Sequence, residues 1–300
     1  MAISTHFAVF YTSTRVIMRN FALVKLCTIF YPNTMKKQLY CAFLFCIAAL
    51  SAMPLSAQTS DGQSTEGKDF WVTFLQADQD PNNALTLSLS ISSRQDCKVT
   101  LSNPFTGYSE EVDVVANQMK LVEIYNGNVL VGTARPAMTA TGKVCYAVNS
   151  EKTDTCALHI TSTEDISLFA TNYKKATFDA TNVIPTASLL DEYYIQMYSP
   201  SDKDGVTASQ GSHFAIIATE DNTIVDYYPT VMTQNIHESI KKAQDKQSGG
   251  YTLTHEDSVW LNYTFVPGAK MTTPVLKKGE VFYVWTGKAD SENGDLSGTH

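Results

Sequence analysis

The sequence predicts an all-β protein built from antiparallel four-stranded meanders. Two observations support this prediction: short apolar-alternating runs separated by turn residues fill most of the chain, and one hairpin-like phrase recurs. The phrase begins with alternating apolar residues that end in hydroxyl residues, continues through a polar turn carrying Asp, and returns in a second β-branched run. It occupies residues 87–99, 157–166 and 214–224, and the isoleucines at the centre of its first run lie 69 and 57 residues apart. A spacing that long requires a repeating unit larger than one hairpin.

A second pattern extends the unit to four strands. Val183-Ile-Pro185 and Phe265-Val-Pro267 each lead into an acidic and aromatic run. The expected meanders cover residues 85–125, 156–198 and 213–286. Since one meander cannot bury both of its faces, neighbouring units must stack; propeller-like stacking is favoured, and a β-sandwich is the alternative because the units differ in length.

The elements follow from the same patterns. The predicted strands are 70–75, 85–92, 98–102, 111–115, 120–125, 143–148, 157–161, 166–171, 182–184, 193–198, 213–218, 223–228, 259–266 and 280–286. Gly, Pro and Asn punctuate the connections, as at Asn103-Pro104. One short surface helix is expected at residues 235–247, where Ile236, Ile240 and Ala243 recur at helical spacing between charged residues.

The N-terminal region has the sequence features of an export signal. Met35-Lys-Lys37 is a basic n-region, residues 39–50 are apolar, and Leu55-Ser-Ala57 is a small-residue cleavage site before Gln58. Residues 35–57 are therefore predicted to be a secretory signal peptide, preceded by an extension (1–34) that an over-extended start would explain. A flexible linker (58–67) and a β domain (68–300) follow. Residues 295–300 resemble the opening of another hairpin phrase, so the domain is expected to be truncated at its C-terminus.

Charge and cysteine content limit the function. Residues 1–57 hold five basic residues and no acid, so the mature chain has 17 basic against 30 acidic residues, a formal charge of about −13. Such an acidic chain argues against nucleic acid or an anionic membrane as partner. Of the three cysteines left after cleavage, Cys145 and Cys156 flank a turn-like segment and are a possible disulfide, with two buried thiols as the alternative.

Several phrases carry a family resemblance. Glu66-Gly-Lys-Asp-Phe-Trp-Val-Thr-Phe74, the phrases at 158–168 and 214–225, and Val183-Ile-Pro185 with Leu190-Asp-Glu-Tyr-Tyr194 resemble the N-terminal domain of the IgGFc-binding protein family over residues 66–300. The resemblance implies a binding or adhesion module. Its bacterial members are secreted or cell-surface proteins, and the signal's Ser-Ala-Gln ending resembles those of Bacteroidetes.

Catalytic and metal-binding motifs are not found. The histidines form neither HxxxH nor HExxH, no Gly-x-Ser-x-Gly elbow or P-loop occurs, and no cofactor is expected. His159 and His213 are interpreted as structural strand residues. Acidic turns at 78–83, 202–204 and 290–295 are interpreted as solvated loops, with calcium binding as the alternative.

Aromatic residues suggest a recognition surface. The Tyr193-Tyr194 pair and Trp285 belong to runs that place aromatic rings on both faces of their strands, where burial of one face would leave a surplus. Packing against a neighbouring sheet would explain them equally well. We therefore expect an exported, non-catalytic module that recognises an extracellular protein or glycan at the outer cell surface, outside the cell or in the periplasm. A secreted carbohydrate-active β-propeller enzyme and a structural spacer of a larger surface protein are the alternatives.

Overall fold

The computed structural model describes residues 7–9, 64–75, 84–128, 134–147, 150–174, 177–197, 212–286 and 295–300. All of them belong to one compact unit. The predicted signal peptide and most of the linker lie outside the described residues. Of the predicted extension, only strand β1 (Phe7–Val9) is described, and it pairs with a strand of the domain, β10 (His213–Ala218).

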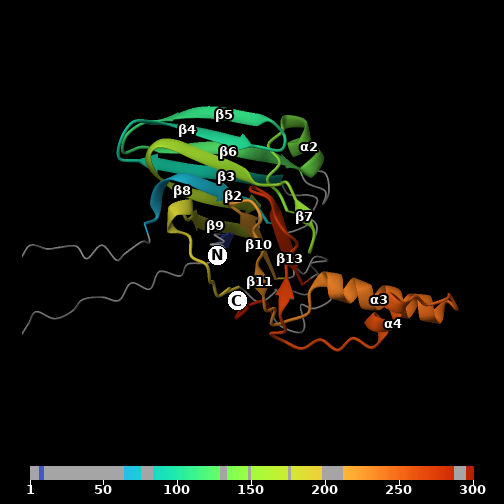
Figure 1. Cartoon of the computed structure of the whole chain (residues 1–300). Helices are drawn as coiled ribbons and strands as arrows, with labels where there is room; N and C mark the ends of the chain where they lie inside the picture. The colour runs from blue at the N-terminus through green and yellow to red at the C-terminus, as the bar shows by residue number, and fades with distance from the viewer. Residues whose placement is uncertain are drawn as a thin grey trace, which may run out of the picture. The chain divides into compact units, whose positions relative to one another are not determined.

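The described part of the chain is mostly β, as predicted, and its larger sheet has seven antiparallel strands (Figure 1). They are β2 (Glu66–Val72), β3 (Ala84–Ser93), β4 (Cys97–Asn103), β5 (Tyr108–Val114), β6 (Met119–Asn128), β8 (Leu158–Lys174) and β9 (Thr177–Val183). Strand β8 is central and 17 residues long. Its first half lies between β4 and β2, and its second half lies between β3 and β9.

The predicted hairpin at 157–166 is wrong, because this phrase forms one continuous strand within β8. Its polar residues 163–165 have no ladder partner, and they lie where β2 is bulged and where the chain bends between β3 and β4. The ladders on both edges of β8 are therefore interrupted at this point, while β8 itself continues. Hydrogen bonds from the Ser93 hydroxyl to the Asp165 carbonyl and from Lys68 Nζ to the Thr163 carbonyl, each 2.8–2.9 Å, satisfy backbone groups there. The strand therefore continues through a segment whose composition suggested a turn.

The other two predicted hairpins also fail as strand pairs. Strands β3 and β4 follow one another along the same edge of β8 and do not pair with each other. After β10 the chain does turn, with Asn222 at φ 61°, but β10 pairs with β13 (Val281–Trp285) and the next strand, β11 (Asp226–Tyr227), pairs with β12 (Met271–Thr272). The four-stranded meanders are therefore wrong, since β3 of the first expected unit pairs with β8 of the second. Neither the propeller-like stacking nor the sandwich is confirmed.

A second sheet has the order β1-β10-β13-β7, where β7 is Thr153–Asp154. Strands β10 and β13 are buried on both faces, so two hydrophobic clusters form on the two sides of this sheet. Ala215, Ile217 and Tyr283 join the core beneath the larger sheet, whereas Phe214 and Phe282 join a smaller cluster. Packing on both sides, the alternative considered for the aromatic runs, explains the composition of the run in β13.

The predicted helix is confirmed as α3 (Gln234–Ser248), which lies next to α4 (His255–Leu261) (Figure 1). The expectation of a single helix is wrong, because α2 (Ala134–Thr141), α4 and the short 3-10 helix η1 (Thr186–Ser188) are also present. Residues 255–261 include the start of a predicted strand. A capping box, in which Thr254 and Asp257 exchange hydrogen bonds, begins the helix there instead.

Candidate binding pocket

The three aromatic candidates from the sequence are not brought together. Tyr193 and Tyr194 lie on the extended segment after η1, where Tyr193 lines a pocket and Tyr194 has 64% of its surface exposed. Trp285 is only 8% exposed and belongs to the large core, on the face of β13 opposite Phe282. Side chains alternate between the two faces of a strand, so Trp285 points away from the cluster that forms the pocket floor.

The pocket has a volume of about 450 Å³. Four pieces of chain enclose it: the segment 191–195, strand β10, the segment 224–228 that contains β11, and residues 299–300. Its floor is apolar and buried, and consists of Ile195, Phe214, Ile216, Val225 and Tyr227. Its rim is polar and aromatic.

Backbone hydrogen bonds hold the rim segments together. The Ile195 N–H donates to the Thr299 carbonyl and the Gly298 N–H donates to the Ile195 carbonyl, both at 2.8 Å. On the other side, the Tyr228 N–H donates to the His300 carbonyl at 2.9 Å. Residues 298–300 therefore lie between two segments that are more than thirty positions apart in sequence, and join them into one wall.

Three aromatic rings stack along this wall. The ring of His300 lies 5.2 Å from that of Tyr194, with 22° between the planes, and 4.5 Å from that of Tyr228, with 7° between the planes. Tyr193 is fixed separately, because the Leu190 N–H donates to its phenol oxygen at 2.6 Å. The rim thus presents aromatic rings whose positions are set before any ligand arrives.

Three carboxylates stand on the same rim: Asp191, Glu192 and Asp226. Asp226 has a cationic partner, Lys270 Nζ at 2.8 Å, and accepts a hydrogen bond from Thr272 Oγ1 at 2.7 Å. These two partners, Lys270 first, hold the pKa of the Asp226 carboxyl below its usual value. Glu192 accepts a long hydrogen bond, 3.4 Å, from the Tyr194 hydroxyl.

A buried hydrogen-bond network supports the floor. The hydroxyl of Tyr227 donates to one oxygen of Glu151 at 2.8 Å, and the hydroxyl of Thr233 donates to the other at 2.6 Å. Burial, and then the negative charge of Glu151, raises the pKa of Tyr227. The phenol therefore stays a neutral donor that ties β11 to the chain before β7 and to the start of α3.

Of the sequence candidates, Tyr193 lines the pocket and Tyr194 stacks on His300 at its rim, but the rest of the rim was missed. Asp191 stands in a phrase that carries the family resemblance, whereas nothing in the pattern around Asp226 or His300 marks them, because they lie in separate segments that only the fold brings together. The two histidines interpreted as structural include His159, whose Nε2 lies 2.7 Å from Asp69 Oδ2 and whose ring stacks on Trp71. That interpretation is confirmed for His159, which makes these contacts away from the pocket.

The remaining predicted sites are as follows. Cys97, Cys145 and Cys156 are present as buried thiols, so the structure does not contain the predicted bond between the last two. The described part of the chain has no group of three or more His, Cys, Asp or Glu placed to hold a metal ion. The acidic turns at 78–83 and 202–204, and most of the third at 290–295, lie outside the described residues.

Comparison with known proteins supports the resemblance noted from the sequence. Residues 179–300 match the family model described as IgGFc binding protein. This segment contains every residue that lines the pocket. A search of curated proteins and a search of solved structures each found no match. Among the described residues, no helix is both long and apolar enough to cross a bilayer.

Proposed function

We propose that this protein is an exported, non-catalytic binding module of a bacterial surface protein, and that it recognises an extracellular protein through the pocket beside Tyr193 and Tyr194. One observation carries the proposal: the segment that matches a family named for binding also builds a preformed pocket with an apolar floor and an exposed aromatic rim. Aromatic anchors in such pockets supply most of the binding energy in many interfaces. Export by the predicted signal peptide would place the module outside the cell.

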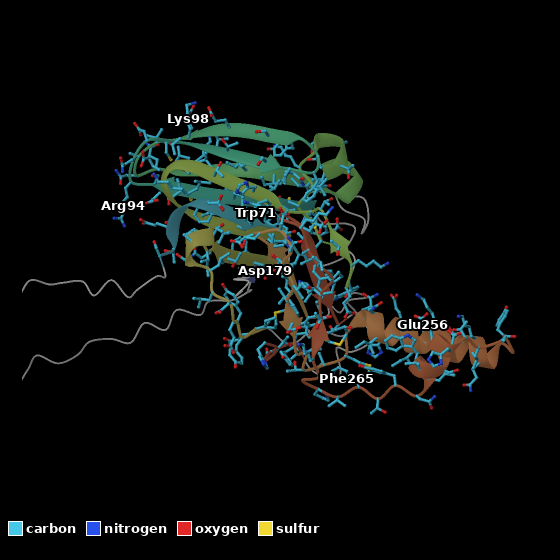
Figure 2. All side chains as sticks on the ribbon, in the orientation of Figure 1. Trp71, Arg94, Lys98, Asp179, Glu256 and Phe265 are labelled. Atoms are coloured by element: carbon cyan, nitrogen blue, oxygen red, sulfur yellow. The ribbon has the colours of Figure 1, made fainter. Side chains whose placement is uncertain are left out.

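The arrangement of acids favours binding over glycoside hydrolysis. A hydrolase needs a general acid whose pKa is raised, paired with a second carboxylate across the substrate. In the pocket, the pKa of Asp226 is lowered. Among the residues that the structure describes, the acid whose pKa burial raises is Asp179, on β9 of the larger sheet (Figure 2). It does not line the pocket, so it cannot serve there as the proton donor.

The test is a binding array with the full-length chain. Extracellular proteins, including IgG Fc, and glycans would be screened for saturable binding, and hits repeated with Tyr194→Ala. Tyr194 stacks on His300, which lines the pocket. The matched control is Tyr251→Ala, because Tyr251 is also highly exposed, at 72%, but belongs neither to the pocket lining nor to this aromatic stack. We expect Tyr194→Ala to weaken binding of a protein hit by about tenfold or more while Tyr251→Ala leaves it unchanged.

Four outcomes would overturn the proposal. Equal binding by both tyrosine variants would place the site elsewhere on the molecule. Binding confined to glycans would replace the protein partner with a carbohydrate, and failure to bind anything would favour the structural spacer. Turnover in a parallel panel of glycosidase and peptidase substrates, abolished by Asp191→Asn or Asp226→Asn, would favour the enzyme.

A further inference from the structure

The pocket carries more negative charge than its surroundings neutralise. Asp191 and Glu192 are both exposed on the rim, and in the part of the chain that the structure describes neither forms an ion pair with Lys or Arg. Only Asp226 has such a partner, Lys270. The mature chain adds a long-range contribution of the same sign, since its formal charge is about −13. A positively charged ligand would therefore be both attracted to and stabilised at this rim.

The aromatic rings are suited to the same charge. A ring face attracts a cation through its quadrupole, with Arg the most frequent partner. The ring of His300 stacks with those of Tyr194 and Tyr228, and the rings of Tyr193, Tyr228 and His300 line the pocket. The hydrogen bond from the Leu190 N–H holds the phenol of Tyr193 in place beside them. Rings fixed in this way bind a cation without first losing conformational freedom.

The floor completes the match to a long basic side chain. Ile195, Ile216 and Val225 present buried aliphatic surface below the charged rim. Lys and Arg carry apolar methylene stems beneath their charged heads, and they bury these stems along apolar surface while the head stays near solvent. A volume of about 450 Å³ is ample for one such side chain. A small metal cation would use neither the rings nor the apolar floor, and a neutral sugar would leave the two carboxylates without a counter-charge.

We propose that the pocket receives a basic side chain, arginine above all, from the extracellular protein partner. This inference rests on the proposed function and specifies the chemistry of the same site. The guanidinium lies between the carboxylates of Asp191 and Glu192 and the aromatic rings that line the pocket, and its stem lies on the floor. Arginine is preferred over lysine because its planar group can stack on a ring and pair with a carboxylate at the same time.

The experiment compares two peptides that differ in charge alone. The probes are acetyl-Gly-Arg-Gly-amide and the same peptide with citrulline, which replaces the guanidinium by a neutral urea of nearly identical shape. Binding to the full-length chain is followed by nuclear magnetic resonance titration of the tyrosine and histidine ring protons. We expect saturable, weak binding of the arginine peptide and at least about tenfold weaker binding of the citrulline peptide. Raising the salt to about 0.5 M should weaken the arginine peptide only.

Two matched variants locate the charge effect. The double variant Asp191→Asn/Glu192→Gln should weaken the arginine peptide by about three- to tenfold and leave the citrulline peptide unchanged. The control Glu256→Gln removes an exposed carboxylate from α4 (Figure 2), which contributes no residue to the pocket, and should change neither. All three substitutions lie on exposed residues, so the variants are expected to fold as the parent does.

The outcomes separate this inference from the proposed function. Equal binding of both peptides, or an arginine peptide insensitive to the double variant, would overturn the basic-side-chain proposal. If the array nevertheless yields a protein partner that depends on Tyr194, the proposed function stands and only the chemistry assigned to the pocket fails. A neutral oligosaccharide that displaces the arginine peptide would overturn both.

Discussion

Gly279 is a position where one added methyl group should measurably destabilise the fold. Its φ is +84°, in the left-handed region that side chains other than glycine's disfavour. A Cβ built there would lie 2.8 Å from Cζ3 and 3.0 Å from Cη2 of Trp71. Trp71 cannot easily move, since it is only 2% exposed and its ring is stacked 4.2 Å from that of His159.

Two costs add for Gly279→Ala. The left-handed backbone contributes about 1–2 kcal/mol, and overpacking against a ring that cannot withdraw contributes about 1–3 kcal/mol. The free energy of unfolding should therefore fall by about 2–5 kcal/mol. Gly268→Ala is the matched control, because Gly268 has a similar φ of +75° but nothing within 4 Å of the added Cβ. Only the backbone cost applies there, so about 1–2 kcal/mol is expected.

Urea unfolding followed by tryptophan fluorescence measures both variants against the parent chain. The difference between the losses in free energy of unfolding of the two variants isolates the cost of the contact with Trp71 from the cost of the left-handed backbone. If Gly279→Ala is no more destabilising than Gly268→Ala, Trp71 is not held as tightly as its stacking and burial indicate, and the reasoning fails.

Three further predictions concern pH, cysteine chemistry and processing. Lys246, and then the hydrogen bonds of the capping box, lower the pKa of Asp257 from 3.8 to about 2. A carboxyl whose pKa is lower in the folded state stabilises the folded protein at pH values above its unfolded-state pKa. This contribution to the free energy of unfolding should be lost as the pH falls from about 4 to about 2. In urea unfolding at a series of pH values, Asp257→Asn should therefore approach the stability of the parent at the acid end. Peptide mapping of exported protein under non-reducing conditions should recover the Cys145 to Cys156 disulfide. In reduced, folded protein, burial raises the pKa of the Cys145 thiol and should prevent its alkylation until urea is added. N-terminal sequencing of exported protein should begin at Gln58.

Each of these has a clear contrary result. A stability gap between the parent and Asp257→Asn that does not narrow in acid would mean that the ion pair joining α3 to α4 contributes nothing in solution. Recovery of Cys145 and Cys156 only as separate thiols would make them core residues, as the structure shows them. Exported protein that starts at Met1 would exclude the signal peptide and retain β1 in the mature domain.

Several features of the fold could be predicted from residues that are close together in sequence. The alternation of apolar and polar residues identified a mostly β chain, and the helical spacing of Ile236, Ile240 and Ala243 placed α3 within a residue of its observed bounds. The capping box at Thr254 could have been read in the same way. These features are decided within one turn of helix or one strand, so the residues that specify them are neighbours in sequence.

Strand pairing, in contrast, depends on contacts between residues that are far apart in sequence. The three recurring phrases read as hairpins, yet β8 runs straight through its expected turn because β2, β3, β4 and β9 supply partners along both of its edges. A turn-like composition says where a chain can reverse, whereas the choice among partners depends on which apolar faces are buried together. That choice is made over separations of tens of residues, which local patterns do not encode.

The sequence by itself determined that this is an acidic, mostly β chain with a segment that matches the model of a family named for binding, and it marked Tyr193 and Tyr194 as candidates. Only the tertiary structure separated them from Trp285, because the strand period places that ring on the core side of β13. It also brought Asp191, Asp226 and His300 to the same rim from three distant segments. A binding pocket is a property of surfaces that meet in space, so its charge and its aromatic stack emerge only once the chain has folded.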